Sequence, residues 1–308
     1  MRKTVNTNHI SGWIYQHDLA ERQTGPNSKN PGTDYISGTI SVVTDDAGLN
    51  VVPIHFSFVT PTTKNGGSNA TYNVLKNIIN GVYKTVMSDG KDNASKIIVD
   101  TAIDLNEFYS DRSGTEELVS VKRNEGGFVH IVNDIDPDEK KRNKFTVDML
   151  ITSVVVREAE DDKPAKATLK GAIFNFRNAL LPVEFAVYNP NAIAYFEGLG
   201  ASAKAPVFTK VAGRQISETV VNSITEECAF EGEALVRETP SSNKEYVITW
   251  AATEPYAWDE EGSITAQELT EAMAARQTYL ATLKARNDEY KASRNAPAAA
   301  PAEGGFNF

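Results

Sequence analysis

Aromatic and basic side chains that alternate along one strand-like segment have the clearest chemical potential in this sequence. In residues 167–176, Ile173 is predicted to face the core, so Lys170, Phe174 and Phe176 should face outward, because alternate side chains of a strand lie on opposite faces. Exposed rings can stack on unpaired nucleobases while nearby cations meet phosphates. The same predicted surface is extended by Arg177 and Tyr188. The alternative is that these rings pack against another part of the protein.

A second predicted binding surface lies in the first half of the chain. Trp13 and Tyr15 alternate on one strand, and the turn-rich loop that follows carries Arg22 and Lys29. The set of predicted phosphate contacts is completed by the basic pair Lys122 and Arg123. A further basic cluster at residues 140–144 follows an acidic run and is explained more simply as a solvated linker.

Catalytic signals are nearly absent. The four histidines lie far apart, without cysteine or acidic partners at metal-ligand spacing. The single cysteine, Cys228, stands among Glu226, Glu227 and Glu231, whose charges disfavour the thiolate that a nucleophile needs. The sequence therefore predicts no catalytic residue, no metal site and no cofactor.

The elements that must position these side chains are mostly strands. Each half of the chain has three strand-like segments, then a helical segment, then two more strands. A Gly-x-Ile segment beginning at Gly38 recurs at Gly171, and an apolar-Pro-apolar-x-Phe segment follows it in both halves. A helix between the third and fourth of five strands is the order of the OB barrel. We therefore predict a mainly β fold of two tandem OB-like five-stranded barrels, with a C-terminal helix and a disordered tail.

Strict alternation assigns the strand faces in both halves. Ile54, Phe56 and Phe58 are predicted to face the interior, and His55 and Ser57 the outside. In the equivalent strand of the second half, the side chains predicted to face the interior are Val183, Phe185 and Val187. Those predicted to face outward are Glu184 and Tyr188.

The predicted domains follow from this order. The first barrel should cover residues 1–138, the second 139–255, an acidic segment with the C-terminal helix 256–294, and a flexible Ala/Pro tail 295–308. Thr265 and Glu268 have the spacing of a capping box that opens the helix. Its apolar stripe can dock on the body of the protein or mediate self-association, and consists of Leu269, Met273, Leu280 and Leu283.

Charge and hydropathy limit the partners. The net charge of −10 argues against nucleic acid at first, but residues 226–271 alone hold twelve acids and two bases, which accounts for the whole excess. Apolar runs are too short for a membrane helix, and one cysteine fits a reducing compartment, so the cytoplasm is the expected location.

Four segments carry a resemblance to a known family, namely Ser11-Gly12-Trp13, residues 24–31, residues 174–177 and residues 189–197. The chain resembles phage and prophage proteins with OB-fold character that are similar to phage single-stranded DNA-binding proteins. The resemblance spans most of residues 5–292 and implies coating of replication or recombination intermediates in the host cytoplasm, without catalysis. It also implies that an aromatic C-terminal tail, here Phe306 and Phe308, recruits replication or recombination proteins. The sequence departs from that pattern because Glu303 is the only acid in the last ten residues.

Three roles are compatible with these features. The first is sequence-tolerant binding of single-stranded DNA by base stacking. The second is a phage structural or assembly role, with the barrels as interaction modules and the C-terminal helix as a subunit contact. The third is an accessory factor that binds a replication or recombination enzyme through its tail.

Overall fold

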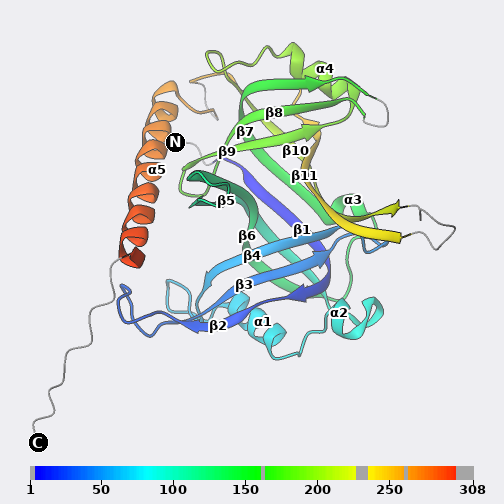
Figure 1. The fold of residues 1–308 in the computed structure, drawn as a ribbon, viewed down its shortest axis with the longest axis vertical. Helices are drawn as coiled ribbons and strands as arrows, with labels where there is room; N and C mark the ends of the chain where they lie inside the picture. Colours follow the sequence, from blue (N-terminus) through cyan, green and yellow to red (C-terminus); the bar gives the residue numbers. More distant parts are fainter. Residues whose placement is uncertain (1–3, 161–163, 227–234, 260–262, 296–308) are drawn as a thin grey trace, which may run out of the picture.

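The computed structural model describes residues 4–160, 164–226, 235–259 and 263–295 (Figure 1). Its strands form one eleven-stranded sheet that closes on itself twice. None of the described helices is long and apolar enough to span a membrane.

The first closed half of the sheet, here called barrel 1, has the OB strand order. The third strand pairs in parallel with the fifth, and the other four pairings are antiparallel, so the sheet closes after five strands. Its strands are β1 (Asn6–His17), β3 (Asp34–Val43), β4 (Val51–Val59), β5 (Lys96–Ser110) and β6 (Glu117–Val132), and the short β2 (Ala20–Gln23) pairs with the start of β3. Between β4 and β5 lie α1 (Ala70–Ile79), α2 (Val86–Asp89) and the 3-10 turn η1 (Lys91–Asn93).

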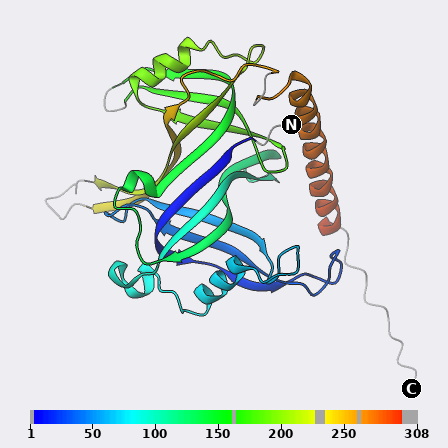
Figure 2. The same cartoon turned by 180° about the vertical axis from the view of Figure 1, so that it is seen from behind.

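Barrel 2 repeats this order and these pairings. It consists of β7 (Asn143–Arg157), β8 (Lys166–Phe174), β9 (Leu180–Val187), β10 (Val207–Glu226) and β11 (Leu235–Ala251), with α3 (Glu139–Arg142) before β7 and α4 (Pro190–Gly198) between β9 and β10. The predicted pair of barrels, each with a helix between its third and fourth strands, is confirmed. The two first strands, β1 and β7, pair with each other and join the barrels, and Figure 2 shows β1 crossing the middle of the molecule.

Each barrel encloses its own apolar core. In barrel 1 the core includes Ile40, Ile54 and Phe56, all fully buried, as the strand alternation predicts. In barrel 2 the buried ring of Phe145 stacks on Phe185 at 5.2 Å between centroids. Ile103 and Leu105 of β5 join this second core, because the β5–β6 hairpin extends past barrel 1 onto barrel 2. Replacing a buried Phe by Ala at such a position costs about 3–5 kcal/mol.

The prediction that Phe58 faces the interior is wrong. The pairing of β3 with β4 shifts between Ile36–Val59 and Gly38–Phe56, so Ser57 and Phe58 together oppose one residue, which is a β-bulge. The extra residue reverses the alternation. Phe58 therefore faces outward and is 53% exposed.

A buried polar network fixes the barrels against each other. The side chain of Asn124 on β6 donates to Gln215 Oε1 on β10 at 2.7 Å and accepts from Asn8 Nδ2 at 2.8 Å. The Tyr246 hydroxyl of β11 donates to the same Asn124 oxygen at 3.0 Å. Such a network specifies one relative orientation, because any other orientation leaves buried polar groups without partners.

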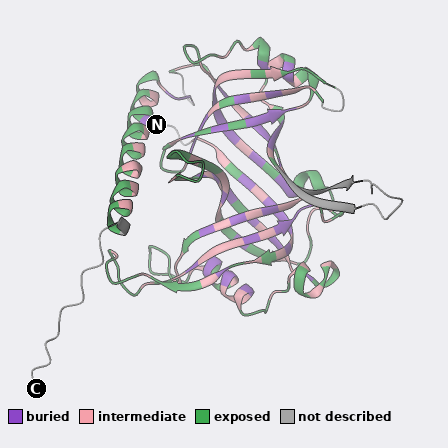
Figure 3. Cartoon of the chain, viewed as in Figure 1, coloured by how far each residue is buried: buried purple, intermediate pink, exposed green. Residues whose placement is uncertain are grey.

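The C-terminal helix, α5 (Ala266–Asn295), begins as predicted. Thr265 N–H donates to Glu268 Oε2 at 3.0 Å, and Glu268 N–H donates to Thr265 Oγ1 at 3.1 Å, which is a capping box. The helix docks through its first turns, since Ala272 is buried but Met273 is 56% exposed. Beyond that point ion pairs hold it to the β5–β6 hairpin, with Arg276 bidentate on Glu107 at 2.5 and 2.6 Å. Most of its surface is exposed (Figure 3).

Candidate nucleic-acid interface

OB barrels bind oligonucleotides on the face of their second and third strands and on the adjoining loops. In barrel 1 these strands are β3 and β4. Tyr35 of β3 and Phe58 of β4 lie together on this outer face, with ring centroids 4.5 Å apart and ring planes tilted by 35°. Tyr35 faces outward because its neighbour Ile36 is buried in the core, and Phe58 faces outward because of the bulge. We call these two rings the aromatic platform.

Three cations lie at the same end of the barrel as the platform. Arg22 of β2 is paired with Tyr35 in the β2–β3 ladder, and Lys29 lies in the loop just before β3. Lys64 lies in the loop just after β4. Ile36, near the start of β3, pairs with Val59 at the end of β4, so this loop begins at the same end of the barrel as Tyr35. All three side chains are exposed, and within the described part of the chain none of them forms an ion pair. Arg22 and Lys29, both predicted from sequence, are thus brought to one surface.

Two acids lie near the platform, and one of them is paired. The carboxylate of Glu21 is paired with Lys76 at 3.2 Å, and the carboxylate of Asp34 accepts from Gln23 Nε2 at 2.8 Å. Asp34 keeps its negative charge, because its donor is a neutral amide, so the three cations give this end of the barrel a local excess of positive charge over Asp34.

Arg123, also predicted, lies further along the same outer face. Its Nη2 donates to Ser57 Oγ at 3.3 Å and pairs with Glu125 Oε2 at 3.1 Å. Burial, with a smaller contribution from the Arg123 charge, lowers the pKa of His55. This part of the face is therefore polar with little net charge.

Trp13 and Tyr15, predicted as a binding surface, lie away from the platform. Trp13 pairs with Val43, eight residues along β3 from Tyr35, which is roughly 26 Å at the usual rise of a strand. Two cations already lie over the Trp13 ring, Lys91 Nζ at 4.2 Å and the Arg142 guanidinium at 5.4 Å. Tyr15 lies two residues further along β1 and is half-buried.

Phe174 is wrong as a stacking residue. It lies on the outer face of β8 as the alternation predicts, but it is only 1% exposed. The chain after β11 and the start of α5 cover it, so that it packs against Phe208, Ile264 and Ala272. The alternative recognised from sequence, packing on the C-terminal helix, is the one that the structure shows.

The remaining candidates on barrel 2 are engaged within the protein. Lys170 pairs with Glu184 at 3.2 Å across the β8–β9 ladder. The Tyr188 hydroxyl donates to Glu245, and burial together with this hydrogen bond raises the pKa of Tyr188 to about 12. β8 and β9 consequently present no exposed aromatic ring of their own.

The prediction that Lys122 contacts a phosphate is also wrong. Its Nζ donates to the backbone oxygen of Glu184 and lies 5.0 Å from the ring centroid of Tyr246 and 5.4 Å from that of Phe185. Burial lowers the pKa of Lys122 to about 8. The side chain thus links the β5–β6 hairpin to barrel 2 and is not available to a phosphate.

Phe176 is exposed as predicted, at 79%, on the turn between β8 and β9. The Arg177 guanidinium lies 5.0 Å from its ring centroid. Both residues lie away from the face of β8 and β9, and Phe176 borders a separate groove. The predicted partner-binding residues Phe306 and Phe308 lie outside the described residues.

Sequence reasoning missed Tyr35, Phe58 and Lys64. Strict alternation placed Phe58 in the core. A signal that could have found Tyr35 is its position next to Ile36, since a core residue in a strand turns its neighbours outward.

Comparisons place the chain in a family without naming a ligand. A search of curated proteins finds no match. Two solved structures are similar, a deletion mutant and the wild type of the single-stranded DNA binding protein from Thermus aquaticus. The mutant is 11% identical in sequence with a TM-score of 0.46, and the match covers 84% of this chain and 100% of the mutant chain. The wild type is 10% identical with a TM-score of 0.45, and the match covers 83% of this chain and 96% of the wild-type chain. At TM-scores below 0.5 neither likeness bears on fold or function. The family model described as YorF matches residues 4–286, so the chain belongs to the YorF family.

Proposed function

We propose that this protein binds single-stranded DNA on the outer face of β3 and β4, without catalysis and with little sequence preference. The observation that carries the proposal is the aromatic platform, Tyr35 with Phe58, at an end of the barrel that also carries three exposed cations without an ion pair to any described residue. Aromatic faces accept any base, because every base has a π surface, and each stacked base contributes roughly 1–3 kcal/mol. Arg22, Lys29 and Lys64 would meet the phosphates on either side of the stacked bases.

The overall negative charge is compatible with this mechanism. A single strand needs a local cationic path and a stacking surface, whereas non-specific binding of a duplex depends mainly on phosphate neutralisation. With a formal charge of −10, the chain is expected to bind duplex DNA poorly. We extend the proposal to a role in phage replication or recombination in the host cytoplasm, which rests on the sequence resemblance alone.

Fluorescence anisotropy with dye-labelled oligo-dT tests the proposal. The double variant Tyr35→Ala/Phe58→Ala should bind about 5- to 150-fold more weakly than wild type, the range that corresponds to the loss of one stacked base. Trp250→Ala is the matched control, because Trp250 is 52% exposed on barrel 2, away from the platform. Its affinity should equal that of wild type.

Equal affinity of the double variant and wild type, with unchanged circular dichroism, would refute the platform as the binding site. Wild type that does not bind oligo-dT but assembles into regular particles would favour the assembly role instead.

A further inference from the structure

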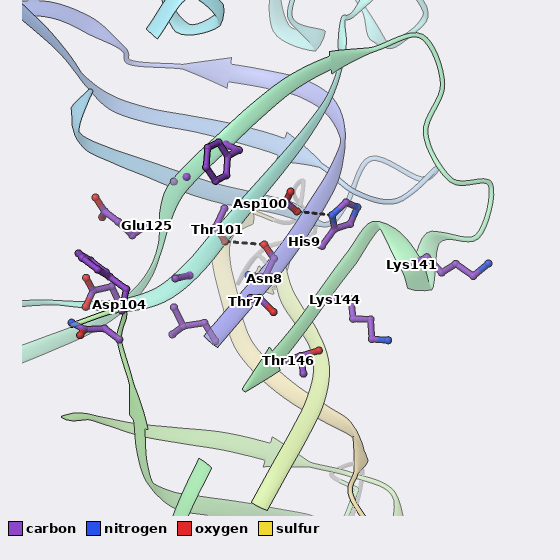
Figure 4. A pocket seen from close by; sticks show the side chains of 17 residues that line it. Thr7, Asn8, His9, Asp100, Thr101, Asp104, Glu125, Lys141, Lys144 and Thr146 are labelled. Carbon is purple, nitrogen blue, oxygen red and sulfur yellow. Dashed lines mark hydrogen bonds and ion pairs between the residues drawn. The ribbon is translucent and has the colours of Figure 1, made fainter. Parts of the chain in front are cut away.

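A groove of about 850 Å³ lies on the outer surface where the two barrels meet (Figure 4). Its floor is formed by β6, β5, β1 and β7, which lie side by side in that order in the sheet. Strand register places Phe128, Asp100, His9 and Lys144 in one row across these four strands. Because β1 belongs to barrel 1 and β7 to barrel 2, the groove exists only when both barrels are in place.

Two exposed rings border this groove. Phe128 is 71% exposed and Phe176 is 79% exposed, the two highest values among the large hydrophobic side chains of the described residues. Exposed apolar rings at a groove cost free energy in water, which marks them as candidate contacts for a ligand.

A second β-bulge turns Phe128 outward. The β5–β6 pairing shifts between Asp100–Phe128 and Thr101–Gly126, which leaves Gly127 as the extra residue. Two glycines are needed here. A Cβ on Gly126 would lie 2.3 Å from the Phe56 ring, and a Cβ on Gly127 would lie 2.7 Å from the Asp100 carbonyl oxygen. As at Phe58, the extra residue reverses the alternation and exposes an aromatic ring.

Charge divides the groove along its length. The side formed by α3 and β7 carries Lys141 and Lys144, and Lys144 forms no ion pair with any described residue. The side formed by β5 and β6 carries the carboxylates of Asp100, Asp104 and Glu125, of which Glu125 is paired with Arg123 at 3.1 Å. His9 lies between the two sides, with Nδ1 2.9 Å from Asp100 Oδ1. Asp104 is half-buried, and this burial raises the pKa of its carboxyl.

This division suits one strand of nucleic acid lying along the groove. Phosphates would lie on the lysine side, and bases would stack on the two rings above the carboxylate side. Carboxylates there can accept hydrogen bonds from exocyclic amino groups, as acidic side chains do from cytosine N4. Thymine has no exocyclic amino group, and its one donor at that edge, N3–H, lies between two carbonyl oxygens that the carboxylates would repel.

We infer that this groove is a second site for single-stranded DNA, selective for bases that carry an exocyclic amino group over thymine. The inference rests on the proposed function and adds a base preference that the aromatic platform lacks. Figure 4 shows the basic side chains Lys141 and Lys144 on one side of the groove and the carboxylates of Asp104 and Glu125 on the other.

Titration with oligo-dC and oligo-dT of equal length tests the inference. Wild type should bind oligo-dC about fivefold more tightly, which corresponds to about 1 kcal/mol for one base contact. The variant Phe128→Ala/Phe176→Ala should lower the oligo-dC affinity to the oligo-dT value and leave oligo-dT binding unchanged. Phe108→Ala is the control, because Phe108 is an exposed aromatic of the same hairpin outside the groove.

Equal affinity of wild type for the two oligonucleotides overturns the inference, and so does a preference that persists in Phe128→Ala/Phe176→Ala. The proposals for the platform and for the groove can be refuted separately. Tyr35→Ala/Phe58→Ala should weaken oligo-dT binding most and increase the preference for oligo-dC, whereas the groove variant should abolish only that preference. Asp104→Asn gives a further check, because the amide adds a donor for thymine O4 and should narrow the preference.

Discussion

Phe58 of β4 packs against Tyr35 of β3 at 4.5 Å between ring centroids on the outside of barrel 1, although Phe56, two residues earlier, is fully buried inside it. The extra residue of the β4 bulge reverses the side-chain alternation, so that Phe56 is buried and Phe58 is exposed. A ring placed outside in this way adds little to the core but gives a base a surface to stack on. The binding site of the proposed function therefore depends on a backbone irregularity as much as on residue type.

The three cations around the platform should set the salt dependence of binding. For single strands, each phosphate contact contributes about 0.7 to the slope of log affinity against log salt concentration. The triple variant Arg22→Gln/Lys29→Gln/Lys64→Gln should therefore reduce the slope by about 2 in oligo-dT titrations from low to high salt. Lys170→Gln is the control, because Lys170 is paired with Glu184. An unchanged slope in the triple variant would place the phosphates elsewhere.

Phe174 should matter for stability, whereas Phe176 should not. Phe174→Ala removes a buried ring from the cluster under α5 and should lower the free energy of unfolding by about 3–5 kcal/mol in urea titrations. Folded Phe174→Ala protein should bind oligo-dT as wild type does. Phe176→Ala, at a position 79% exposed, should leave unfolding unchanged within about 0.5 kcal/mol. Loss of oligo-dT affinity in folded Phe174→Ala would contradict this assignment.

Lys122 should make stability rise with pH in the alkaline range. Burial lowers its pKa from 10.5 to about 8 in the folded protein. Between these values the unfolded chain binds the proton more fully than the folded protein, so the free energy of unfolding increases as pH rises from about 8 towards 10. Above that range the buried Tyr246, whose pKa is raised by burial, opposes the gain because only the unfolded chain loses that proton.

Urea unfolding of wild type and Lys122→Met at pH 8 and pH 10 measures this effect. The methionine variant keeps an apolar stem over the Tyr246 and Phe185 rings but has no titrating group. Its stability should increase less between the two pH values than that of wild type. Parallel pH profiles would show that the Lys122 ammonium is well solvated.

Part of the candidate site was predictable from sequence. Arg22 and Lys29 were predicted because the loop between the first two strands of an OB barrel is a ligand loop; Arg22 pairs with Tyr35 in the β2–β3 ladder, and Lys29 lies in the loop at the same end of the barrel. Phe176 was predicted to be exposed and is. Phe174 has the same alternation as Phe176 but the opposite environment, since residues some 90 positions later in the chain cover it. No local pattern contains that contact.

Lys122 illustrates the same limit for charge. In sequence it stands next to Arg123 and looks like half of a basic patch. In the structure the two side chains take opposite faces of the β5–β6 hairpin, and only Arg123 remains on the outer face of barrel 1. Lys122 reaches barrel 2 because the hairpin is long enough to cross the junction.

Local sequence patterns predicted the order of strands and helices, the duplicated barrel, most interior positions and the capping box of α5. These features depend on alternation, helical periodicity and turn chemistry, all of which act over a few residues. Tertiary structure alone decided which outward-facing rings meet water. Two bulges, at Phe58 and at Phe128, and the docking of α5 over Phe174 set those exposures, because they arise from pairing between strands and from packing between segments far apart in the chain.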